Sequence, residues 1–272
     1  MTHLYPSRLT TLLFGVLFST GGCTPADAGR PDRTSAEYLQ IIALEDARPT
    51  GGSDLAALIA ASTTNHDYLR QTAVRALGRL ENPELVEEIA KHMADPVAEI
   101  RAQVVDALAQ AVHRSEGTAT LEILLSHLMS EEEAVVRGVY AHSLGRLRLD
   151  ANDRARAIDA ILDLSTVDGE DAHASTLEGV ALGLEATVRR SRGMPISGRL
   201  EGRLTDLASF DRARQQSEPL SAQVRLLALS ALGQAGVITG ELVEGGLSDA
   251  NPRVRTMAAQ YLGTVPAAQR PD

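Results

Sequence analysis

The sequence predicts an all-α fold, an α-solenoid of about six stacked helix pairs. Its strongest signal is a recurring pattern in which an arginine-type position is followed eight residues later by a glycine-type position, with leucine directly before the latter. The pattern occurs at Arg70/Gly78, Arg101/Ala109, Arg137/Gly145, Ser175/Gly183, Arg225/Gly233 and Arg255/Gly263. Successive first members lie 31, 36, 38, 50 and 30 residues apart. A period in the thirties that contains two helical segments is typical of solenoids built from helix pairs.

The second helix of each pair carries this pattern. Within residues 68–80 and 98–110, apolar residues fall at −1, +3, +4 and +7 from the arginine, which places them on one face of an α-helix. The small residue at +8 leaves room for a neighbouring helix to approach closely. First helices are expected at 54–62, 83–94, 118–129, 152–164, 198–209 and 239–247. Such short helices are marginally stable alone, so stacking must supply their stability.

Capping residues mark several helix starts. Asn82, Asp95 and Asn251 each precede a proline, which suits the first position of a helix. Two further pairs fit the capping box, in which a hydroxyl residue precedes a glutamate by three positions: Ser130 with Glu133 and Thr34 with Glu37.

Two stretches, 95–108 (DPVAEIRAQVVDAL) and 249–263 (DANPRVRTMAAQYLG), resemble the HEAT-repeat family in its short bacterial form, the PBS-lyase-type repeat. The resemblance extends over about residues 37–263 and implies the same stack of helix pairs. The family places an acid six residues before the arginine, and such pairs form a ladder between adjacent repeats. The resemblance therefore implies a structural role for Asp95/Arg101, Glu131/Arg137 and Asp249/Arg255. Ser175 departs from the pattern.

Composition and charge argue against a nucleic-acid partner. The chain carries a net charge of −10, contains no tryptophan and has a single lysine, Lys91. Its arginines alternate with acids along the expected helices instead of clustering, so a phosphate backbone would be repelled.

Residues 1–22 are predicted to be a signal peptide. Arg8 is followed by an apolar run over 9–18, which is too short to span a bilayer core of about 30 Å as a helix. Small residues then lead to Cys23, the only cysteine. This arrangement resembles a bacterial lipoprotein signal, which implies a lipid on Cys23, although Thr20 stands where leucine is usual.

The alternative is ordinary cleavage near Gly22 or Ala28, which would leave an exported protein without a lipid. In the lipoprotein interpretation, residues 23–36 form a flexible tether, because they combine proline, glycine and charges. We then expect the protein in a bacterial cell envelope, on the periplasmic side or at the outer membrane.

No residue pattern points to catalysis, a metal or a cofactor. The seven histidines include no H-x-x-x-H or H-E-x-x-H spacing, and no cysteine stands near them. The acidic run 131–133 is expected to be a solvated first helical turn, and 168–171 lacks the ligand spacing of a calcium loop. Glycine loops typical of nucleotide binding or acyl transfer are also missing.

We therefore expect the protein to function by binding a partner. If the second helices line the concave surface, as in HEAT proteins generally, position +5 from each arginine points away from the core. These positions hold Arg75, Asp106, His142, Val180, Ser230 and Gln260. All except Val180 are polar and form the candidate partner-contacting set. A merely solvated face is the alternative. An extended surface suits a protein or peptide more than a small-molecule substrate.

The leading hypothesis is a non-enzymatic HEAT-repeat interaction scaffold. The alternative is the repeat portion, or a degenerate relative, of a lipoprotein that joins HEAT repeats to a cyclophilin-type peptidyl-prolyl isomerase. A cyclophilin barrel needs many strands and aromatic residues, whereas residues 264–272 are expected to be a short tail. The long interval within 184–220 is expected to hold an elongated second helix, a loop near 191–197, a first helix and a second loop, and loops often carry function.

Overall fold

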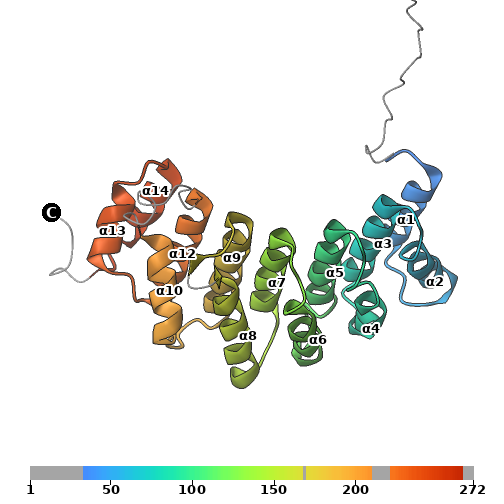
Figure 1. Cartoon of the computed structure of the whole chain (residues 1–272), viewed down its shortest axis with the longest axis horizontal. Helices are drawn as coiled ribbons and strands as arrows, with labels where there is room; N and C mark the ends of the chain where they lie inside the picture. Colours follow the sequence, from blue (N-terminus) through green and yellow to red (C-terminus); the bar gives the residue numbers. More distant parts are fainter. Residues whose placement is uncertain (1–32, 168–169, 210–220, 266–272) are drawn as a thin grey trace, which may run out of the picture. The chain divides into compact units, whose positions relative to one another are not determined.

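Two rows of helices make up the part of the chain that the computed structural model describes, residues 33–167, 170–209 and 221–265 (Figure 1). In the second-helix row, each helix contacts the next in chain order. This row comprises α1 (Ala36–Ala47), α3 (Asp67–Arg79), α5 (Ala98–Ala111), α7 (Ala134–Arg146), α9 (Ala174–Arg190), α12 (Ala222–Ala235) and α14 (Pro252–Tyr261).

The first-helix row packs against it, each member on the second helix of its own repeat. It comprises α2 (Gly52–Ala61), the 3-10 turn η1 (Pro83–Leu85) with α4 (Val86–Ala90), α6 (Thr118–Leu128), α8 (Ala151–Leu164), α10 (Gly198–Ala208) and α13 (Gly240–Leu247). The predicted all-α solenoid of helix pairs is thereby confirmed. The described residues add one two-stranded antiparallel hairpin, β1 (Thr166–Val167) with β2 (Glu170–Asp171), between α8 and α9.

Helix α1 precedes the first complete pair and was missing from the expected set of helices. It packs against α3 in the way that one second helix packs against the next, and therefore covers the N-terminal end of the row. Its N-cap is Ser35, whose hydroxyl accepts a hydrogen bond from the Tyr38 amide at 3.2 Å. The prediction of Thr34 as the capping residue was wrong by one position.

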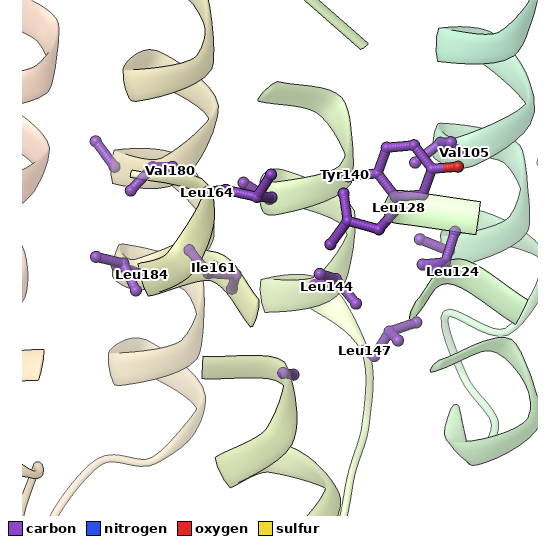
Figure 2. Packing of buried hydrophobic residues seen from close by; sticks show 14 of the residues in the cluster. Val105, Leu124, Leu128, Tyr140, Leu144, Leu147, Ile161, Leu164, Val180 and Leu184 are labelled. Atoms are coloured by element: carbon purple, nitrogen blue, oxygen red, sulfur yellow. The ribbon is translucent and has the colours of Figure 1, made fainter. Parts of the chain in front are cut away.

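Aliphatic side chains from both rows form the core. Figure 2 shows Leu124 and Leu128 of α6 beside Leu144 and Tyr140 of α7, and all four are buried. On the next pair, Ile161 of α8 lies close to the α9 ribbon near Leu184, and both are fully buried. The sequence places apolar residues at a helical period on each helix, and pairing buries those faces against each other.

The expected helix start at Ser130 is wrong. Ser130 donates its hydroxyl to the His127 carbonyl at 2.9 Å instead of capping, and α7 begins at Ala134 after Glu133, which makes no side-chain cap. The side chain of Glu131 is only 5% exposed, so this acid is not part of a solvated turn. Arg101 holds the Glu131 carboxylate in the preceding interface, which delays the start of the helix.

The expected helix over 83–94 is interrupted. The chain forms η1, then the short α4, and turns at residues 91–94. Asn82 and Asn251 cap as expected, with side chains that accept from the Glu84 and Arg253 amides. Asp95 accepts from the Val97 amide at 2.9 Å, but α5 begins only at Ala98.

The long interval of the repeat begins as expected, with α9 extended to 17 residues and followed by a turn and α10. Residues 210–220 lie outside the described part, as do the predicted signal peptide at 1–22, the candidate lipid site Cys23, most of the tether 23–36 and most of the tail 264–272. Within the described ranges, no helix is both long and apolar enough to cross a bilayer.

Candidate functional site

A ladder of ion pairs joins successive repeats. Arg70 on α3 donates Nε and Nη2 to the Asp95 carboxylate at 2.7 and 3.2 Å. Arg101 repeats this geometry with Glu131 at 2.8 and 2.9 Å. The third such pair joins Arg225 to Asp249, at 2.6 and 2.9 Å. Each carboxylate thus accepts from the arginine of the preceding repeat.

The arginine six residues after each acid uses the main chain instead. Arg101 Nη1 donates to the Asp95 carbonyl at 3.0 Å, and Arg255 Nη1 donates to the Asp249 carbonyl at 2.8 Å. One acidic residue therefore holds two arginines from consecutive repeats, one through its side chain and one through its backbone. This arrangement fixes both the spacing between repeats and the turn before each second helix.

The ladder acids are ionised in the fold despite their burial. Burial by itself raises the pKa of Asp95 and of Asp249, but the arginine and backbone N–H donors outweigh it and the pKa of each is lowered. For Glu131 the hydrogen bond from Arg101 is the largest influence, and the pKa is again lowered. These three buried carboxylates therefore have a structural role as ion-pair partners of arginines.

The ladder is interrupted between α7 and α9. Arg137 occupies the ladder position of α7 but forms no ion pair with any described residue, and its Nε is buried without a hydrogen-bond partner. Ser175 replaces arginine on α9. Here the two backbones approach each other directly, and the Thr176 hydroxyl donates to the Ala134 carbonyl at 2.8 Å.

Four glycines make this approach possible. They are Gly138 and Gly145 on α7 and Gly179 and Gly183 on α9. A Cβ placed on Gly179 would lie 2.0 Å from the Gly138 carbonyl oxygen, and one on Gly183 would lie 2.1 Å from the Ala141 oxygen. The expected role of the small residue at +8 is confirmed at Gly78, Gly145, Gly183 and Gly233, where a Cβ would meet an adjacent second helix.

The candidate partner-contacting residues are only partly free. Arg75 Nη2 donates to Glu45 of α1 at 2.8 Å, and the Asp106 carboxylate accepts from Arg146 Nη2 of α7 at 2.6 Å. Their side chains remain 39% and 35% exposed. Both residues therefore link neighbouring second helices and still present part of their surface to solvent.

The other members of the set differ in exposure. His142 is half-buried, and burial is the main cause that lowers its pKa, with nearby Arg146 acting in the same direction. Ser230 is half-buried and accepts from Gln234 Nε2 at 2.9 Å, whereas Gln260 is exposed. Val180 is fully buried, so position +5 of the fourth repeat faces the core, contrary to the expected outward direction.

The sequence pattern did not reveal which residues complete these contacts. Glu45 is 5% exposed and holds both Arg75 and Arg79, while Gln234 of α12 donates to Glu185 of α9 at 2.9 Å. These partners lie 30 to 49 residues apart. No spacing within one helix could have identified them.

Within the residues that the structure describes, no group of three or more histidine, cysteine, aspartate and glutamate side chains is arranged to hold a metal ion. The ionisable side chains that lie together include the ladder pairs and the second-helix contacts described above, and ion pairs on the first-helix row such as Arg156–Glu122.

Residues 55–145 match the family model for HEAT repeats, a range that runs from within α2 to the end of α7. Over these residues the chain is similar to HEAT repeats. No curated protein matches the chain significantly. Solved structures that resemble it include a designed armadillo repeat protein (TM-score 0.43, 13% identity) and computationally designed armadillo repeat proteins for modular peptide recognition (TM-score 0.42, 14% identity). Each match covers 77% of this chain and 98% of the other.

Proposed function

We propose that this HEAT-like protein is a non-enzymatic scaffold that binds a protein or peptide along its second-helix row. The observation that carries the proposal is the chemistry of equivalent positions in successive repeats. Five of them are polar and at least partly exposed, and they differ from one repeat to the next: Arg75, Asp106, His142, Ser230 and Gln260. Equivalent positions that carry different side chains in successive repeats can recognise different residues of a partner, and so can distinguish one partner sequence from another.

The spacing of the row suits an extended partner. Packed helices lie about 8–10 Å apart, and an extended chain advances about 3.3 Å per residue. A peptide that crosses the row would therefore meet a new repeat about every three residues. Arg75 and Asp106 are partly exposed and are already oriented by Glu45 and Arg146, which reduces the entropy lost when they contact a peptide.

Site-specific photo-crosslinking tests this proposal. A benzophenone amino acid is placed at Ser230 or Gln260 on the second-helix row, and at Glu87 or Glu241 on the first-helix row as matched controls. We expect both second-helix positions to give the same adduct in cells, and the controls to give none. Adducts of equal yield from both rows, or from the first-helix row alone, would contradict binding along the second helices.

We also propose that the protein is exported to a bacterial cell envelope and anchored by a lipid on Cys23, on the periplasmic side or at the outer membrane. The support is the apolar run followed by small residues and the only cysteine of the chain. Metabolic labelling with a fatty-acid analogue should label the wild type and not Cys23→Ala, which should also leave the membrane fraction. Unchanged labelling and retention would rule out this anchor, while a Ser19→Ala control should behave as the wild type.

A further inference from the structure

A cavity of about 510 Å³ opens where the turn before α6 meets the ends of α7 and α9 and the start of α8. Its apolar lining includes Leu144, Leu147 and Leu149. The charged residues that line it are four arginines and two acids: Arg114, Arg148, Arg154, Arg190, Glu116 and Asp150. The charged side chains of the lining therefore sum to a formal charge of +2, whereas the whole chain has a net charge of −10.

Three arginines of this cavity differ from their neighbours on the same elements. Arg146 of α7 pairs with Asp106, and Arg156 of α8 pairs with Glu122. Arg148, Arg154 and Arg190 form no ion pair with any described residue. Arg148 donates only to the Arg114 carbonyl at 3.5 Å, and Arg154 contacts the Met194 sulfur at 3.7 Å.

The two acids in the lining have other roles. Asp150 caps α8 by accepting from the Asp153 amide at 2.9 Å, and Glu116 accepts from the Thr118 hydroxyl at 3.2 Å. Arg114 is paired with Glu81, which lies outside the lining. Neither acid forms an ion pair with Arg148, Arg154 or Arg190.

The positive potential acts on the arginines themselves. Burial is the largest cause that lowers the pKa of Arg190, and the charges of Arg148, Arg189 and Arg146 lower it further. Guanidinium groups that repel one another in this way are stabilised when an anion enters between them.

We propose that this cavity binds a small dianionic ligand, of the phosphate monoester or dicarboxylate class, through Arg148, Arg154 and Arg190. Guanidinium groups bind such oxygens with two parallel hydrogen bonds. The negative charges of the ligand would meet the three guanidiniums that form no ion pair, and the leucines accommodate an apolar body attached to the charged group. The site is separate from the proposed partner-contacting residues on the second-helix row.

Calorimetry on the purified full chain tests the site at pH 7.5 and constant ionic strength. The probes are inorganic phosphate, succinate and acetate. We expect saturable binding of phosphate, of succinate or of both, and at least tenfold weaker binding of acetate. Which dianion binds more tightly identifies the class of ligand.

Two charge-matched double variants complete the test. Arg148→Gln/Arg190→Gln should weaken the binding of the dianion by at least tenfold, because charge-assisted hydrogen bonds are lost. Lys91→Gln/Arg253→Gln removes the same charge from exposed positions elsewhere, and its affinity for the dianion should stay within twofold of the wild-type value. Circular dichroism confirms that both variants are folded. Equal weakening by the two variants, or no saturable binding of either dianion by the wild type, would overturn the proposal.

Discussion

Gly183→Ala is expected to lower the free energy of unfolding by about 1–3 kcal/mol or more. The new Cβ would lie 2.1 Å from the Ala141 carbonyl oxygen and 2.8 Å from its carbon. These are backbone atoms of α7, so no side-chain rotation relieves the overlap, and the two helices must separate. Urea denaturation followed by circular dichroism should show a lower midpoint.

Gly202→Ala is the matched control, since Gly202 also lies within a helix but has no atom within 4 Å of the added Cβ. At this exposed position in α10, alanine should stabilise the protein by about 0.5–1 kcal/mol through its higher helix propensity. If Gly183→Ala unfolds at the wild-type midpoint while Gly202→Ala behaves as expected, α7 and α9 do not pack backbone to backbone.

Asp249→Ala is expected to cost about 3–5 kcal/mol, the usual result of removing one partner of a buried ion pair. The side chains of Asp249 and Arg225 are 1% and 10% exposed, so the guanidinium loses its carboxylate in a site with little water. The same change removes the acceptor of the Asn251 amide at 2.7 Å. Denaturation by urea should again report the loss.

An exposed ion pair provides the comparison. Asp159 is 63% exposed and pairs with Arg199 at 2.9 Å, so Asp159→Ala should change stability by only about 0–1 kcal/mol. Equal losses in Asp249→Ala and Asp159→Ala would show that burial does not distinguish the two pairs.

The effect of Asp249→Ala should also depend on pH. The Asp249 pKa is lowered in the fold, below the unfolded value of about 3.9. The ion pair therefore contributes fully above about pH 4, and its contribution is lost as the pH falls through the folded pKa. The difference between the wild-type and variant midpoints should shrink as the pH falls below about 4, whereas a gap that stays constant would argue against an ionised Asp249.

The sequence alone was enough for the second helices from α3 onward. Their apolar residues recur with the period of an α-helix, and this local property can be recognised without knowledge of any neighbour. The prediction failed at 83–94 and at Ser130, and at Ser130 an interface contact overrode the local signal. Glu131 is the clear example, because its carboxylate is held by Arg101 of another repeat.

For the candidate partner-contacting set, the pattern correctly indicated polar and exposed character at Gln260 but could not show that Arg75 and Asp106 are bonded to other helices. It also treated Val180 as equivalent to the others, although this side chain is completely buried. How near two helices lie depends on the glycines of both, and one helix viewed alone does not contain that information.

The sequence by itself determined the repeat, its register and the small residue at +8 of four second helices, because these features recur at similar spacings along the chain. The tertiary structure decided which acid each arginine binds, that α1 covers the N-terminal end of the row, and that three arginines meet around one cavity without carboxylate partners. The physical reason is distance. Such contacts join residues that are tens of positions apart, and only the packing of successive helices brings them within a few ångströms.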